Sequence, residues 1–273
     1  MPPATTPHPV SPLLALRGVS KVFPNGTLAL SGFDLNVGAG EFVSLLGPSG
    51  CGKSTALRII AGLSEPSEGL VEWPAQDSTQ RAHQGKPADE TSRIGFVFQE
   101  PTLMPWSNVS GNVSLPLMLK DMAANKSAMR VAAAIDRVGL TGFARAFPRE
   151  LSGGMRMRVS IARALVTEPQ LLLMDEPFAA LDEITRFKLN KDLLQVWQAT
   201  GTTVVFVTHS VFESVCLSNR VVVMTARPGR VFTQLKIDAP YPRDQNFRTS
   251  AEYAAFCRRA SEALAQAMTR NKP

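Results

Sequence analysis

The sequence has few cysteines and no long hydrophobic run. Its three cysteines, Cys51, Cys216 and Cys257, lie far apart, and no two of them have CxxC spacing. An odd number of scattered cysteines supports neither a disulfide framework nor a structural zinc site, so we expect a reducing, cytoplasmic compartment. No segment approaches the roughly 18 apolar residues that a membrane-spanning helix requires.

The N-terminal segment, MPPATTPHPVSP, lacks the apolar region of a signal peptide. Its five prolines predict a disordered tail over residues 1–12. The other end of the chain is basic, because residues 241–273 hold six Lys or Arg and only three acids. Such a tail is attracted to anionic lipid or nucleic acid, but a solvated helix face explains it more simply. No nucleic-acid-binding motif accompanies it.

The length of 273 residues and a hydrophobic content of 44% are sufficient for one large core. Strands and helices alternate after residue 170, which is typical of a largely parallel α/β sheet. Residues 13–46 read as earlier strands, and 74–93 as an exposed loop inside a strand pair. Residues 100–165 include a helical pattern at 127–138 and predict a helical subdomain inserted into the core. Residues 251–270 predict a final amphipathic helix with one apolar stripe, formed by Tyr253, Phe256, Ala260, Leu264 and Ala267.

The most informative segment is a phosphate-binding motif at residues 47–55, which fits GxxxxGK[ST] between a short strand and a helix. Its glycines let backbone N–H groups point inward, and the helix N-terminus adds partial positive charge. Lys53 can then reach the β- and γ-phosphates, while the Ser54 hydroxyl can bind Mg²⁺. The residues predicted to hold the nucleotide here are Gly47, Pro48, Ser49, Gly50, Cys51, Gly52, Lys53, Ser54 and Thr55.

Polar residues end three other predicted strands. The apolar run 171–174 is followed by Asp175, which can hold Mg²⁺, and Glu176, which can polarise an attacking water. His209 follows the strand 203–207 and is predicted to contact the γ-phosphate. Gln99 ends the strand 94–98, and its amide can bridge metal and water. Because ligands bind at the carboxyl ends of parallel strands, these residues are expected to meet at one edge.

A second candidate anion site lies at Leu151-Ser-Gly-Gly-Met155, directly before a helix. Ser152 suits the helix N-cap, and Gly153 and Gly154 leave backbone N–H groups accessible to an anion. An ordinary capped helix is the alternative. Phe23 also allows two interpretations: an aromatic that stacks on a nucleotide base, or a side chain that faces the core.

Together these motifs resemble the ATPases of ATP-binding cassette (ABC) transporters over residues 13–235. The matching set, in the family order, is GPSGCGKST, Gln99, LSGGM, LLLMDEP, Ala180-Leu-Asp182 and His209. The resemblance implies the ABC ATPase fold of the P-loop NTPases: a mostly parallel sheet with an antiparallel β part and a helical subdomain, over 13–240. It also implies a head-to-tail homodimer with ATP and Mg²⁺, in which Ser152, Gly154 and Asp182 face the nucleotide of the other copy and Phe23 stacks on adenine.

Three further features resemble the ATPases of the importers of nitrate, sulfonate, taurine and bicarbonate. They are Met155, the segment 99–106 and Ala226-Arg-Pro-Gly229. In that group the ATPase lies on the cytoplasmic face of the membrane, below a separate permease that receives solute from an external binding protein. Residues 101–112 would receive the permease's coupling helix. The sequence departs from the family at Ser210, Met157 and Phe23, where an acid, glutamine and tyrosine are more usual.

The resulting hypothesis is an ATP-hydrolysing importer subunit that acts on a small anion, with Glu176, His209 and Gln99 in catalysis. A soluble ABC-type ATPase that acts on nucleic acid or in cluster assembly is the alternative, and no nucleic-acid partner is expected. A P-loop kinase is disfavoured because no acceptor-binding lid is evident. Cys51 is expected to be reactive, because Lys53 and the helix N-terminus should lower the pKa of its thiol.

Overall fold

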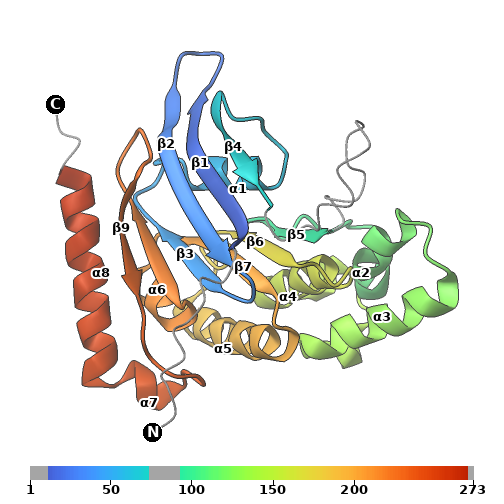
Figure 1. The fold of residues 1–273 in the computed structure, drawn as a ribbon. Helices are drawn as coiled ribbons and strands as arrows, with labels where there is room; N and C mark the ends of the chain where they lie inside the picture. The colour runs from blue at the N-terminus through green and yellow to red at the C-terminus, as the bar shows by residue number, and fades with distance from the viewer. Residues whose placement is uncertain (1–11, 74–92, 270–273) are drawn as a thin grey trace, which may run out of the picture.

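A computed structural model describes residues 12–73 and 93–269 (Figure 1). The chain forms a six-stranded sheet and a three-stranded antiparallel sheet. The larger sheet has the order β5-β6-β7-β3-β8-β9, in which only β9 runs antiparallel to its neighbour. Its strands are β5 (Ile94–Val97), β6 (Leu171–Asp175), β7 (Thr203–Thr208), β3 (Phe42–Leu46), β8 (Arg220–Met224) and β9 (Val231–Lys236).

The smaller sheet has the order β2-β1-β4 and consists of β1 (Pro12–Val22), β2 (Leu28–Gly38) and β4 (Glu68–Glu72). The prediction that the strands before and after the loop 74–93 pair with each other is therefore wrong. β4 pairs with β1, whereas β5 pairs with β6 in the other sheet. The loop itself, up to residue 92, lies outside the described residues, as does the predicted tail 1–11. Residue 12 already belongs to β1.

Helices cover the larger sheet on both faces. They are α1 (Lys53–Ile60), α2 (Val109–Met118), α3 (Ala124–Arg137), α4 (Gly153–Leu165), α5 (Glu183–Thr200), α6 (Val211–Leu217), α7 (Gln245–Arg248) and α8 (Ala251–Thr269). Together with the two sheets they confirm the predicted fold class. α2 and α3 project from one side of the core (Figure 1), in agreement with the predicted helical subdomain. The division into 13–240, with the subdomain at 100–165, and an extension at 241–273 remains our proposal.

The central strands are apolar throughout because both of their faces are buried. Along β6, Leu171 and Leu173 face one core cluster, which includes α1 and the antiparallel sheet. Leu172 and Met174 face the other cluster, together with helices α4 and α5. Alternate side chains thus enter different cores, as expected for parallel strands covered on both sides. This packing fixes the carboxyl ends of β3, β6 and β7, where the candidate site lies.

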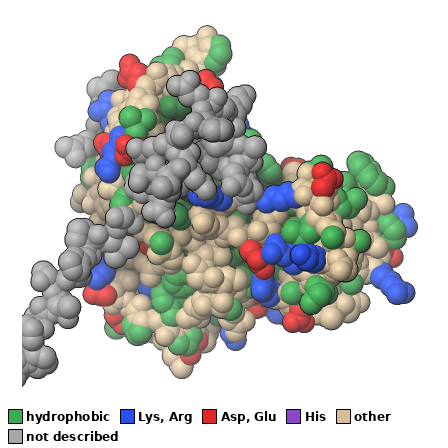
Figure 2. All heavy atoms as spheres, turned by 45° about the vertical axis from the view of Figure 1, so that its right-hand side comes forward, with side chains coloured by type: hydrophobic (Ala, Val, Ile, Leu, Met, Phe, Trp, Pro, Cys, Tyr) green, Lys and Arg blue, Asp and Glu red, His purple; other side chains and the backbone are tan. Residues whose placement is uncertain are grey.

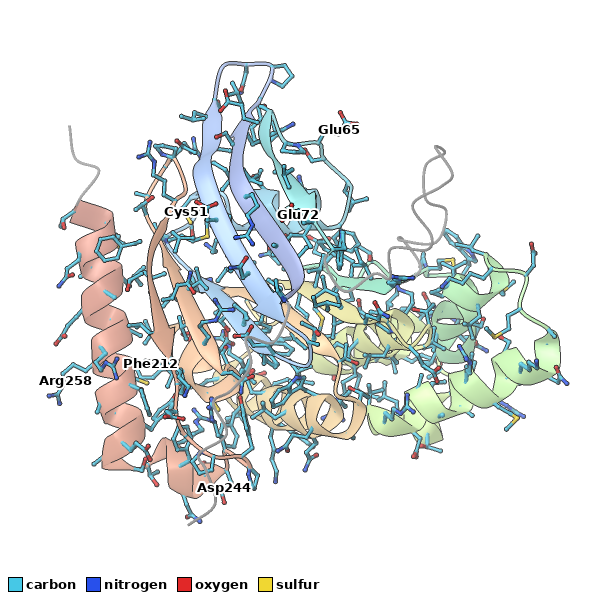
Figure 3. All side chains as sticks on the ribbon, viewed as in Figure 1. Cys51, Glu65, Glu72, Phe212, Asp244 and Arg258 are labelled. Carbon is cyan, nitrogen blue, oxygen red and sulfur yellow. The ribbon has the colours of Figure 1, made fainter. Side chains whose placement is uncertain are left out.

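A third cluster joins α8 to α6, β8 and β9. The buried face of α8 contains Tyr253, Cys257, Ala260, Ala263 and Ala267. The predicted stripe was therefore slightly misplaced, since Phe256 and Leu264 lie at its half-buried edge. Figure 3 shows Arg258 pointing outward from α8, so part of the basic tail is a solvated helix face. Arg243, in contrast, is only 3% exposed and has a structural role.

Candidate active site

The phosphate-binding motif forms the turn between β3 and α1. Gly52 caps the helix with a φ of 102°, in the left-handed region that glycine adopts easily. A Cβ atom at Gly52 would lie 2.7 Å from the carbonyl oxygen of Ala29, so the turn also needs a residue without a side chain. The Lys53 ammonium donates hydrogen bonds to the carbonyl oxygens of Gly47 and Pro48 in the same turn, both at 2.9 Å.

A cavity of about 410 Å³ opens in front of this turn, large enough for a nucleotide. Phe23, Gln99 and Glu176 line this cavity together with the phosphate-binding turn, residues 47–55, which we call the P-loop. The sequence predicted that these residues lie together. Phe23 is thus positioned on a nucleotide-sized cavity rather than in the core. The full lining is Phe23, Thr27, Ala29, Ser49, Gly50, Gly52, Lys53, Ser54, Thr55, Gln99, Glu176 and Arg227.

Ser54 and Asp175 meet at the floor of the site. The Ser54 hydroxyl donates to Asp175 Oδ1 at 2.7 Å. Burial raises the pKa of Asp175, and the Ser54 hydrogen bond opposes that shift. Ser54 and Gln99 line the cavity. Their side-chain oxygens and those of Asp175 are the ligand type that Mg²⁺ prefers. The residues present therefore fit a magnesium ion.

Glu176 is held between two cationic or polar side chains. Its Oε2 lies 2.9 Å from His209 Nδ1, and its Oε1 lies 3.5 Å from the Lys53 ammonium. The backbone of Glu176 has a φ of 45°, which is unusual for a residue with a side chain. Its N–H donates to the carbonyl oxygen of Val207, so β7 holds this conformation in place. A carboxylate so placed can accept a proton from water in the cavity.

The residues on either side of His209, Thr208 and Ser210, make side-chain contacts with Glu213 that were not predicted from the sequence. Thr208 Oγ1 donates to Glu213 Oε2 at 2.5 Å, and Arg186 lies 3.5 Å from the other oxygen of Glu213. Ser210 caps α6 by accepting from the N–H of Glu213. Burial raises the pKa of Glu213. The only sequence signal was an isolated acid one turn after His209, which is too common a feature to single out.

The LSGGM motif forms a separate element. Ser152 is the N-cap of α4 and accepts from the N–H of Met155, and Asp182 caps α5 by accepting from the N–H of Thr185. The two helix starts pack together, because a Cβ atom at Gly154 would lie 2.7 Å from Thr185 Cγ2. Neither Ser152, Gly153, Gly154 nor Asp182 lines the nucleotide cavity. Ser152 and Asp182 are exposed, so this element faces outward.

The expectation that Cys51 is reactive is wrong. Cys51, labelled in Figure 3, is only 1% exposed. Its sulfur packs so closely that a Cβ atom at Gly47 would lie 2.8 Å from it. Burial is the largest influence and raises the pKa of the thiol, although Lys53 acts in the opposite direction. The neighbouring positive charge is therefore outweighed by the loss of solvation.

Comparison with known proteins identifies the family. A model of the ABC transporter family matches residues 30–179, more than half of the chain. The chain belongs to the ABC transporter family. It is an ATPase that binds ATP. Among the described residues, no helix is long and apolar enough to cross a membrane.

Individual relatives cover nearly the whole chain. An ABC transporter ATP-binding protein of Methanocaldococcus jannaschii is 48% identical over 246 residues, 89% of this chain and 88% of that protein. The aliphatic sulfonates import ATP-binding protein SsuB of Bacillus subtilis is 44% identical over 84% of both chains. The ATP-binding cassette MJ0796, in a dimeric post-hydrolysis structure bound to ADP and Pi, matches with a TM-score of 0.70 and 35% identity. That match covers 83% of this chain and 100% of the cassette.

Proposed function

We propose that this ATPase energises the import of a small anion, an aliphatic sulfonate or a chemically similar solute such as taurine or nitrate. The observation that carries this proposal is the similarity over most of the chain to several proteins named for aliphatic sulfonate import. This similarity favours import over the alternative of an ATPase that acts on nucleic acid or in cluster assembly.

In the proposed mechanism, Lys53 and the P-loop amides hold the triphosphate, and Phe23 stacks on the adenine. Ser54, Asp175 and Gln99 would hold Mg²⁺, which offsets the charge of the β- and γ-phosphates when it is bound. Glu176 accepts the proton of the attacking water, and His209 orients Glu176 and contacts the γ-phosphate. Catalysis then rests on positioning and on stabilisation of charge.

We further propose that two copies form a head-to-tail dimer. The start of α4, where Ser152 is exposed, Gly153 half-buried and Gly154 buried, supplies N–H groups suited to a phosphate. Since it does not line the cavity of its own chain, it would complete the site of the other copy, with Asp182 beside it. The dimeric state of the MJ0796 cassette supports this arrangement.

The permease is proposed to dock beside Gln99, on the lobe that contains α2 and α3. A groove of about 370 Å³ lies between β5, α2 and α4 there, and includes Phe98 and Leu119. Trp106 and Leu119 are 77% and 78% exposed. Figure 2 shows hydrophobic and basic side chains interspersed over the lobe. Exposed apolar groups of this size are typical of protein–protein contacts.

The docking surface is mechanically connected to the nucleotide cavity. Arg163 donates to the carbonyl oxygens of Pro101 and Thr102, both at 2.9 Å, and so fixes the segment directly after Gln99. A shift of a partner on this surface would therefore move Gln99 relative to the phosphates. The ATPase would act at the cytoplasmic face of the membrane, with an external solute-binding protein as an indirect partner.

Purification of the tagged full-length chain from detergent-solubilised membranes of its own cell tests this function. We expect an integral membrane polypeptide to copurify, and ATPase activity in reconstituted vesicles to rise with a sulfonate-loaded binding protein. Recovery of nucleic acid or of a cluster-assembly protein, without any membrane polypeptide, would contradict an import function. A Trp106→Ala, Leu119→Ala variant should lose the membrane partner while retaining ATP binding.

A further inference from the structure

The hairpin between β8 and β9 enters the ATP site, although the proposed function assigns it no role. β8 is the hydrogen-bonded neighbour of β3, the strand that leads into the P-loop. The turn that follows β8 therefore lies at the same edge of the sheet as the P-loop. This turn, residues 225–230, contains Arg227-Pro-Gly229, part of a segment noted above for its resemblance to the importers.

The turn is hydrogen-bonded to β2 and lies close against the P-loop. The N–H of Gly229 donates to the carbonyl oxygen of Ala29 at 2.9 Å, and Ser31 donates back to Gly229 at 3.1 Å. Thr225 closes the turn by donating through its hydroxyl to the carbonyl oxygen of Pro228. A Cβ atom at Gly229 would lie 2.1 Å from the carbonyl oxygen of Cys51, so only glycine permits this approach.

This placement directs Arg227 to the nucleotide cavity. Its Nε and Nη2 both donate to the carbonyl oxygen of Gly50, each at 3.2 Å, and its side chain lines the cavity. None of the ion pairs between described residues includes Arg227. Its positive charge is therefore not neutralised by a carboxylate there, unlike that of Lys53, which pairs with Glu176.

We infer that Arg227 is an additional ATP-binding residue that contacts the phosphate chain. A guanidinium offers five N–H donors in a planar fork that matches phosphate oxygens, and two of them suffice for Gly50. The contact with Gly50 holds the fork beside the backbone that cradles the phosphates. Arg227 thus adds a second cation to the site, contributed by a turn far from the P-loop in sequence.

The inference rests on the proposed ATP site. The experiment therefore includes one variant that tests the ATP site and another that is the control for Arg227. Calorimetry would measure the Kd of ATP, ADP and AMP for the full-length wild type and for Lys53→Ala, Arg227→Ala, Arg227→Lys and Arg230→Ala. Lys53→Ala reports on the site itself. Arg230 is the matched control, because it belongs to the same turn but bonds to Ser31 Oγ and does not line the cavity.

Arg227→Ala is expected to raise the Kd of ATP about tenfold, the size of one lost charge-assisted hydrogen bond. The loss should be smaller for ADP and least for AMP, and Arg227→Lys should restore part of the affinity. Arg230→Ala should bind all three nucleotides as the wild type does. The inference fails if Arg227→Ala binds ATP within twofold of Arg230→Ala while Lys53→Ala still loses it. It also fails if AMP and ATP lose affinity equally, because the contact would then be with the nucleoside.

Discussion

The carboxylate of Glu176 lies 2.9 Å from Nδ1 of His209, although 33 residues separate them in the sequence. The two side chains follow adjacent parallel strands, β6 and β7, which bring them to one edge of the sheet. The lysine of the P-loop approaches the other oxygen of the same carboxylate. Glu176 therefore connects the phosphate-binding turn to the helix that begins after His209.

Replacement of Glu176 by glutamine is expected to abolish turnover without abolishing ATP binding. The change keeps the shape of the side chain but removes its ability to accept a proton, which should lower kcat by at least about 100-fold. Steady-state ATPase assays and calorimetry on the same preparation test both statements. Glu72→Gln, an exposed change on β4, is the control and should keep the wild-type rate. Wild-type turnover by Glu176→Gln would remove the proposed base.

Burial predicts that Cys51 does not react in the native protein. Burial raises the pKa of its thiol, which disfavours the reactive thiolate, and the packed sulfur is also inaccessible. Cys216 and Cys257 are buried with raised pKa values as well. A thiol reagent should label no cysteine rapidly in the folded chain and three in urea. Rapid labelling of one cysteine in the wild type that is absent in Cys51→Ser would contradict this prediction. It would show that the charge of Lys53 outweighs the effect of burial on the Cys51 thiol.

Arg243 is expected to be a major contributor to stability in the C-terminal extension. Its Nη1 donates to the carbonyl oxygens of Val215 and Ser218 near the end of α6, and its Nη2 to those of Ile237 and Ala239. Arg243→Met would leave these carbonyl oxygens without the donor, so we expect a loss of about 3 kcal/mol in the free energy of unfolding. Urea denaturation measures it, with Arg258→Met as the exposed control. Equal stability of the two variants would contradict this role.

Gly229→Ala is expected to weaken ATP binding through the position of the turn. The added methyl group would meet the carbonyl oxygen of Cys51 at 2.1 Å, so the hairpin must move away from the P-loop. We expect a several-fold rise in the Kd of ATP and a loss of about 1–3 kcal/mol in stability. Gly142→Ala, with no atom within 4 Å of the added group, is the control. Unchanged affinity in Gly229→Ala would show that the turn and the P-loop are independent.

Position at a strand end was sufficient to predict from the sequence which polar side chains lie at one edge of the sheet. Asp175, Glu176, Gln99 and His209 each follow an apolar strand, and parallel strands bring such ends together. The sequence did not predict contacts that depend on which strands are neighbours in the sheets. Arg227 reaches the P-loop only because β8 lies next to β3, and the pairing of β4 with β1 has no local signal. The burial of Cys51 was missed for a similar reason, since it depends on a core cluster that includes Met224 of β8, far away in the sequence.

The central claim is that each chain carries two halves of different ATP sites, and mixing two inactive variants tests it most directly. Lys53→Ala removes the P-loop half. Gly153→Asp keeps α4, because an acid suits a helix N-terminus, but places a carboxylate where a phosphate of the other copy would bind. Each variant alone should have little ATPase activity.

In the mixed dimer, the intact P-loop of the Gly153→Asp chain faces the intact LSGGM element of the Lys53→Ala chain. The account predicts that the mixture, with Mg²⁺ and ATP, hydrolyses ATP well above the sum of the two separate samples. A mixture of two different P-loop variants, Lys53→Ala and Ser54→Ala, should show no such gain. An activity equal to the sum in both mixtures would contradict the shared site.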